Sequence, residues 1–96
     1  MIEYLYNAIK ATAGEEITIT AKITNDDGVC ITSHCHLMLY DNEELLITVH
    51  GTFVEAEEVW EFTIPAEATK YLSGRYWYCI CGKLGSLCFK EPIYLI

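Results

Sequence analysis

Apolar and polar residues alternate with a period of two over most of the chain. The clearest stretch is residues 17–24, where every second residue is Ile or Ala and the residues between them are threonines or a lysine. A period of two is the signature of a strand with one buried and one solvated face. We therefore predict a half-buried antiparallel strand over residues 17–24, followed by a turn at residues 25–28, where Asn, Asp and Gly cluster.

The same pattern, with turn residues between the segments, predicts further short strands and one helical turn. Strands are expected at residues 4–10, 35–40, 45–50, 54–64, 75–81 and 87–94, hairpin turns at 41–44 and 82–85, and a helical turn within 65–72 that begins at Pro65. Pro92 lies inside the last strand and predicts an edge or a bulge there. Seven short strands without a long helix predict an all-β fold, an immunoglobulin-like antiparallel β-sandwich of about seven strands, with residues 1–96 as its single domain.

Three of the predicted strands are apolar on both faces, at residues 35–40, 76–81 and 93–96. A sandwich strand needs only one apolar face, so we expect another chain to cover the second face. The alternative is that a loop or terminus of the same chain covers it. The residues predicted to form the interface are Trp77, Cys79, Met38, Tyr94, Arg75, Lys83 and Lys90.

Composition and charge restrict the partners. With 52% apolar and 21% charged residues in 96, the chain is expected to fold as one core. Its net charge of −8 repels polyanions and excludes nucleic acid as the expected partner. Residues 1–70 carry most of the acids, whereas residues 71–96 hold three basic residues against Glu91, so the basic end of one copy can attract the acidic body of another. We expect no signal peptide and no membrane insertion, and synthesis in a host cytoplasm.

The cysteine and histidine residues leave several possibilities open. Five cysteines without a secretory signal predict reduced thiols, with a Cys30–Cys35 or Cys79–Cys88 disulfide as the alternative under oxidising conditions. Residues two apart on a strand share a face, so a zinc site is a further alternative, because zinc takes four such ligands. Its candidate ligands are His34, His36, Cys79 and Cys81.

No pattern points to catalysis. The chain contains cysteine and histidine, but only these residue types support a cysteine nucleophile with a histidine base. The sequence contains no nucleophile elbow, phosphate loop or dinucleotide motif. We therefore expect a protein that is not an enzyme and uses no cofactor. A monomeric module that binds a host surface ligand through the loop at residues 25–34 is the alternative to an assembly protein.

One stretch of the sequence resembles a known family. Trp60, Phe62, Ile64 and Pro65, followed by the spacing from Thr69 to Ile80, resemble small virion proteins of tailed bacteriophages, in particular the immunoglobulin-like N-terminal domains of baseplate and tail proteins and short stand-alone prophage proteins. The resemblance covers residues 12–82. It implies a non-enzymatic structural or accessory protein of the tail, baseplate, neck or head, located in the virion and assembled with other virion proteins or with itself.

Two structural predictions come from the residues of this stretch themselves. Tyr76 or Tyr78, near the start of a strand and after Gly74, is expected to form a tyrosine corner, in which its hydroxyl bonds to upstream backbone. The residues expected to meet in the core are Trp60, Phe62, Ile64, Ile19 and Ile23.

Overall fold

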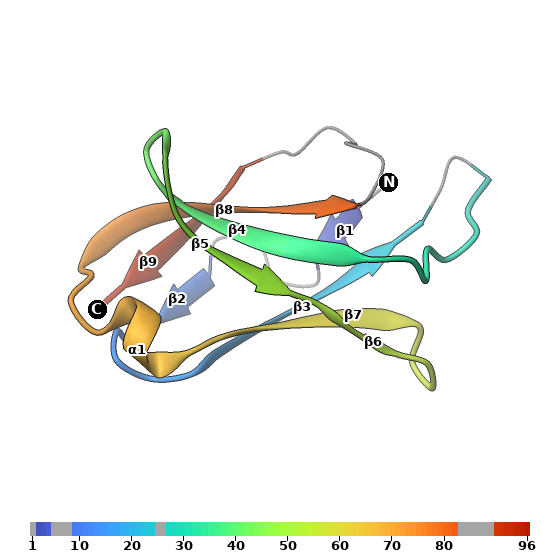
Figure 1. The fold of residues 1–96 in the computed structure, drawn as a ribbon, viewed down its shortest axis with the longest axis horizontal. Helices are drawn as coiled ribbons and strands as arrows, with labels where there is room; N and C mark the ends of the chain where they lie inside the picture. Colours follow the sequence, from blue (N-terminus) through green and yellow to red (C-terminus); the bar gives the residue numbers. More distant parts are fainter. Residues whose placement is uncertain (1, 5–8, 25–26, 83–89) are drawn as a thin grey trace.

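The computed structural model describes residues 2–4, 9–24, 27–82 and 90–96, which form two packed β-sheets (Figure 1). The strands are β1 (Ile2–Tyr4), β2 (Ile9–Ala11), β3 (Ile17–Ile23), β4 (Cys35–Asp41), β5 (Glu44–His50), β6 (Thr52–Val54), β7 (Val59–Ile64), β8 (Gly74–Gly82) and β9 (Glu91–Leu95), with one short helix α1 (Ala66–Thr69) between β7 and β8.

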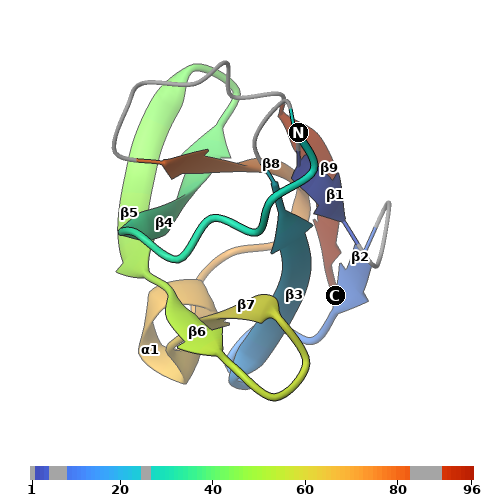
Figure 2. The ribbon, with the colours of Figure 1, turned by 90° about the vertical axis from the view of Figure 1, so that its right-hand side faces the viewer.

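The order of the strands is that of an immunoglobulin-like sandwich. One sheet, here called sheet A, has the order β1-β3-β7-β6, and the other, sheet B, has the order β2-β9-β8-β4-β5. These orders match the ABED sheet and the GFC sheet of immunoglobulin domains, with β2 added beyond the G strand and β5 added beyond the C strand. Figure 2 shows the two layers from the side. The predicted sandwich is confirmed, and among the described strands the pair β2–β9 is parallel whereas the other pairs are antiparallel.

The core lies between the sheets and is made by alternate residues of the central strands. In β3 the burial alternates as the sequence predicts, with Ile17, Ile19, Ala21 and Ile23 buried. The predicted core contacts are confirmed, because one buried cluster holds Trp60, Phe62, Ile64, Ile19 and Ile23 together with residues of sheet B, among them Leu37, Leu39, Tyr78, Ile80, Ile93 and Leu95.

Two polar contacts fix the crossover between the sheets around α1. Tyr76 forms the tyrosine corner, since its hydroxyl accepts a 3.2 Å hydrogen bond from the Ser73 backbone N–H. Thr69, completely buried, accepts a 3.0 Å hydrogen bond at Oγ1 from the Gly14 backbone N–H. Gly14 has a positive φ of 84°, a conformation that favours glycine. The predicted helical turn after Pro65 is therefore confirmed and is bonded to the turn that precedes β3.

The structure divides two of the predicted strands. The predicted strand at 54–64 is a hairpin of β6 and β7 with a turn at residues 55–58, where Glu58 adopts a positive φ of 55°. Three glutamates in that turn favour solvent over a sheet interior. The predicted first strand appears as β1 in one sheet and β2 in the other. The predicted turn at 82–85 lies largely outside the described residues, as does the start of the strand predicted at 87–94.

Pro92 differs in part from its prediction, because β9 lies inside sheet B and not at an edge. It pairs with Trp77 of β8, and the pairing of β9 with β2 begins only at Ile93. The proline thus occupies the level of the sheet at which β9 has one described neighbour. A residue without a backbone N–H fits there, because within the described part of the chain only β8 pairs with β9 at this level.

Candidate protein-binding face

The outer face of sheet B gathers aromatic and basic side chains from separate strands. The pairing of β2, β9 and β8 places Lys10, Tyr94 and Arg75 in one row across the sheet. The next row contains Pro92, Trp77 and Tyr40. Because alternate residues of a strand point to opposite faces, these side chains lie opposite the core residues Tyr76 and Tyr78.

Basic groups lie against the aromatic rings of this face. The Arg75 guanidinium carbon is 5.3 Å from the centroid of the Trp77 ring, and the Lys90 Nζ is 4.2 Å from that of Tyr40. Lys90 also donates a 3.1 Å hydrogen bond to the backbone carbonyl of Asn42. Cation–π contacts of this kind hold the long basic side chains over the sheet. We call these six residues, Tyr40, Trp77, Tyr94, Lys10, Arg75 and Lys90, the aromatic–cationic face.

The face is exposed in part within the single chain. Trp77, Tyr94 and Tyr40 are half-buried, whereas Lys10, Arg75 and Lys90 are exposed. Half-buried rings flanked by basic groups can still lose area to a partner. The six residues include three of the six Lys and Arg residues of a chain whose net charge is −8, so basic charge is concentrated here.

Five of the seven predicted interface residues lie at or beside this face, one is buried, and one lies outside the described residues. Trp77, Tyr94, Arg75 and Lys90 belong to it, and Met38 adjoins it because its Sδ accepts a 3.4 Å hydrogen bond from the Tyr40 hydroxyl. Cys79 points to the same side, but it is only 1% exposed in the single chain and offers a partner almost no area. Lys83 lies outside the described residues.

The sequence did not single out Tyr40 and Lys10 for this face. The period of two assigns each residue to one face of its own strand. Only the sheet order shows that β4 lies beside β8 and that β2 lies beside β9. No sequence signal gives that order directly. The period of two shows which residues of one strand share a face, not which strands are neighbours.

Of the four cysteines that the structure describes, one departs from the expected reduced state. Cys81 is disulfide-bonded, whereas Cys30, Cys35 and Cys79 are free thiols. The alternative pairs Cys30–Cys35 and Cys79–Cys88 are therefore not formed in this structure. Burial raises the pKa of the Cys79 thiol, against the lowering effects of the Lys90 charge and a hydrogen bond to Tyr40. Burial and, less strongly, the nearby Cys30 raise the pKa of Cys35.

The predicted zinc ligands do not form a tetrahedral set here. His36 and Cys81 are paired across β4 and β8, and the sulfur of Cys81 is already bonded in a disulfide. His34 lies in the segment before β4. Within residues 2–4, 9–24, 27–82 and 90–96, no three His, Cys, Asp or Glu side chains gather closely enough to hold a metal ion.

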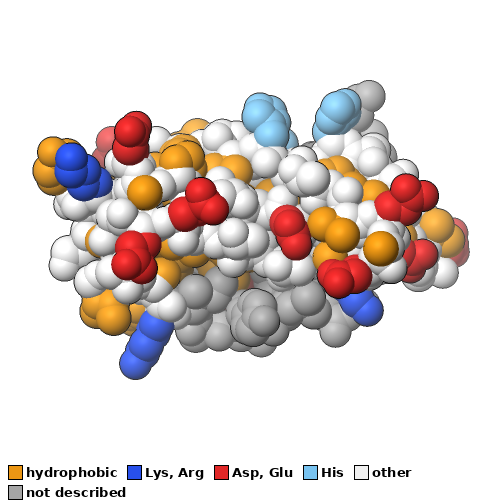
Figure 3. Space-filling model, turned by 90° about the horizontal axis from the view of Figure 1, so that it is seen from below, with side chains coloured by type: hydrophobic (Ala, Val, Ile, Leu, Met, Phe, Trp, Pro, Cys, Tyr) orange, Lys and Arg blue, Asp and Glu red, His pale blue; other side chains and the backbone are white. Residues whose placement is uncertain are grey.

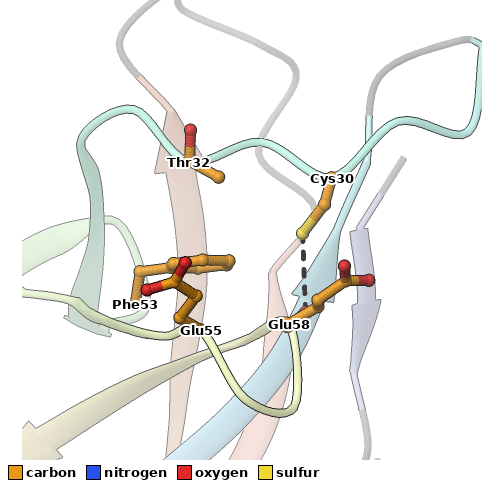
Figure 4. A pocket seen from close by; sticks show the side chains of 5 residues that line it. All are labelled: Cys30, Thr32, Phe53, Glu55 and Glu58. Carbon is orange, nitrogen blue, oxygen red and sulfur yellow. Dashed lines mark hydrogen bonds between the residues drawn. The ribbon is translucent and has the colours of Figure 1, made fainter.

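A pocket of about 410 Å³ lies where the loop before β4 meets the β6–β7 hairpin. Figure 4 shows Cys30 and Thr32 on one side of it and Phe53, Glu55 and Glu58 on the other. The Cys30 thiol donates a 3.5 Å hydrogen bond to the Glu58 backbone carbonyl. Part of the loop predicted as a binding site therefore lines this pocket, while residues 25 and 26 lie outside the described part of the chain.

The side of the molecule formed by sheet A and α1 has a different character. Its outward residues on β3 and β7 include Thr18, Thr63 and Glu61, and the hydroxyls of the two threonines lie 3.4 Å apart. Figure 3 looks onto this side and shows acidic side chains spread over it. The two sides of the sandwich thus differ, one polar with scattered acids and the other aromatic with basic groups.

No helix in the described residues is long and apolar enough to cross a membrane.

Comparison with known proteins supports the architecture. Neither a family model nor a curated protein sequence matches the chain. Among solved structures, the crystal structure of the S-layer protein SbsC domains 4 and 5 matches with a TM-score of 0.65 at 13% sequence identity. The match covers the whole of this chain and 51% of the other, so the chain spans about half the length of that structure. The fold of the chain is similar to that of this S-layer protein structure. An identity this low carries the fold and no further property.

Proposed function

We propose that this domain is a non-enzymatic assembly module that binds an acidic protein surface through the aromatic–cationic face. The observation that carries the proposal is the gathering of Trp77, Tyr94 and Tyr40 with three basic groups on the outer side of sheet B. Aromatic residues and arginine are the types enriched at protein interfaces, and they supply most of the binding free energy.

Charge complementarity favours an acidic partner. The β6–β7 turn of this chain, with Glu55, Glu57 and Glu58 exposed, shows the kind of surface that fits. A second copy of the chain or a larger structural protein can present such a surface. Opposite charges on the two surfaces would speed association and set orientation, while the rings supply buried area.

The finer proposal places the module in a tailed-bacteriophage or prophage virion, as part of the tail, baseplate, neck or head. Its support is the sequence resemblance at residues 60–80. The sandwich fold is compatible with a virion role and with a role like that of an S-layer protein, so the fold does not distinguish between the two. The chain would then be made in the bacterial cytoplasm and would act in the particle. Mass spectrometry of purified particles from the producing strain tests this placement.

Photo-crosslinking tests the binding face itself. A photoreactive phenylalanine analogue is placed at position 77 of the full chain in the cell that produces it, and the same analogue at Thr63 on the outer side of sheet A is the matched control. We expect a discrete protein adduct from position 77 and none from position 63. Equal adducts from both positions, or none from position 77, would contradict the proposal.

A ligand-binding module is the second candidate, and the pocket beside Phe53 favours it. Its volume lies within the range of small-molecule sites, which is roughly 300–1,000 Å³. A ligand seated there would cover the Cys30 thiol. If a bound small molecule protects Cys30 from an alkylating reagent and position 77 gives no crosslink, this function is favoured over assembly.

A further inference from the structure

Strand β5 is a long edge strand. The two sheets end in β1, β6, β2 and β5; β1 and β2 border residues that the structure does not describe, and of the other two, β6 has three residues whereas β5 has seven. Short edges limit pairing with other chains, and long edges favour it. Residues 45–49 contain no charge and no proline, and Leu45 and Leu46 are 48% and 39% exposed.

The hydrogen-bond pattern shows which backbone groups of β5 face away from β4. The Gly51 N–H donates a 2.9 Å hydrogen bond to the Cys35 carbonyl. Bonded and non-bonded pairs alternate along an antiparallel ladder, so the pair Leu37–Val49 is bonded and the pair Met38–Thr48 is not. The N–H and C=O of Thr48 therefore point outward from the edge of sheet B.

We propose that a second copy of this chain pairs with β5 in antiparallel fashion, with the twofold axis at Thr48. Thr48 of each copy then exchanges two backbone hydrogen bonds with Thr48 of the other. Ile47 of one copy comes to lie opposite Val49 of the second copy, and both are half-buried residues on the core side. The two five-stranded sheets become one continuous sheet, and each core extends across the joint.

Two features of β5 select this arrangement. The register shift opposite Leu39 and Tyr40 leaves Leu46 without a partner on β4, so the regular part of the strand begins at Ile47. A twofold axis at Thr48 uses that regular part. Antiparallel pairing also keeps the acidic turn of each copy, with Asp41, Glu43 and Glu44, at opposite ends of the joint. Parallel pairing would bring these acidic groups together.

The dimer leaves the aromatic–cationic face of each copy outside the joint, and it is tested separately from that face. Molar mass is measured by light scattering after size exclusion, up to a protein concentration of roughly 1 mM, a range that includes weak dimers. We expect wild type to approach twice 10.9 kDa as concentration rises. Thr48→Pro removes the outward N–H without removing a bond to β4, and it should remain a monomer. Thr48→Val keeps the N–H and should dimerise.

Circular dichroism identifies a Thr48→Pro variant that has failed to fold. In that case Thr48→Lys and Thr48→Glu provide the test, because like charges at the axis should weaken each homodimer and their equal mixture should restore the dimer mass. A wild type that stays monomeric throughout, or a folded Thr48→Pro variant that still dimerises, overturns the proposal. Trp77→Ala should leave the β5 dimer unchanged. If Trp77→Ala alone dissociates the dimer, the copies meet through the aromatic–cationic face and the β5 pairing is wrong.

Discussion

The indole Nε1 of Trp60 donates a 2.7 Å hydrogen bond to the backbone carbonyl of Ile31. Trp60 is 4% exposed and lies between Ala21 of β3 and Phe53 of β6 in sheet A. Ile31 belongs to the loop that crosses from sheet A to sheet B. One side chain thus packs in the core and also holds the crossover loop, and this loop lines the pocket with Cys30 and Thr32.

Trp60→Phe should destabilise the fold by about 2 kcal/mol, because it leaves the Ile31 carbonyl without its donor and also removes buried ring volume. Urea unfolding measures the change in the free energy of unfolding. Trp77→Phe, the same substitution at a half-buried position on the outer face, is the matched control and should cost less than about 1 kcal/mol. Equal losses at the two positions would show that the Trp60 hydrogen bond contributes little.

Gly51→Ala should destabilise the fold by roughly 1–3 kcal/mol through overpacking. Gly51 connects β5 to β6, and a Cβ at this position would lie 2.5 Å from Phe62 Cε1 and 2.8 Å from Trp60 Cε3. Both rings are buried and cannot move away without disturbing the core. Thermal unfolding followed by circular dichroism measures the effect, with Thr52→Ala at the next, exposed position as the control. An unchanged melting temperature for Gly51→Ala would contradict this close approach.

Thr69→Val should cost about 1–2 kcal/mol, since it keeps the shape of the side chain and removes the acceptor for the Gly14 N–H. The same hydroxyl lies 3.4 Å from the Ala66 carbonyl oxygen, to which it donates. Thr18→Val, at an exposed threonine on β3, is the comparison. Hydrogen exchange at the Gly14 amide gives a local readout, and we expect faster exchange in Thr69→Val only. Unaltered protection at Gly14 would show that the contact does not hold the turn.

The raised pKa of Cys35 predicts a fall in stability in alkaline solution. The folded state holds this proton more tightly than the unfolded chain does. The contribution of the Cys35 thiol to the free energy of unfolding is therefore complete below pH 9.0, the ordinary pKa of a thiol, and is lost as the pH rises through the higher pKa of the folded state. The free energy of unfolding of wild type should therefore decrease more steeply above pH 9 than that of Cys35→Ala. Identical slopes for the two proteins would argue against a buried, protonated Cys35.

The sequence could predict those parts of the fold that depend on one strand at a time. Alternation places Ile17 and Ile19 on the core side of β3, and Gly74, at the start of β8, points to the tyrosine corner at Tyr76. The division of residues 54–64 into two strands was missed, because Val54 and Val59 continue the apolar pattern on both sides of the acidic turn. A pattern of apolar residues does not show where a chain reverses direction.

The candidate site could be predicted only in part, for the same reason. Trp77 and Tyr94 were identified from the apolar character of both faces of their strands, whereas Tyr40 enters the site because β4 lies beside β8. Cys79 shares the face of Trp77 but is buried within its own chain. Burial of this kind depends on packing across several elements, which alternation along one strand does not encode.

The most direct test of the proposed assembly role is hydroxyl-radical footprinting of Trp77 in the isolated chain and in the native assembly from the producing cell. Tyr71, which is 88% exposed and lies in the segment between α1 and β8, is the internal control. We predict that oxidation of Trp77 and Tyr94 falls several-fold in the assembly while oxidation of Tyr71 is unchanged. Equal oxidation of Trp77 in both states would contradict the conclusion that this face binds the partner.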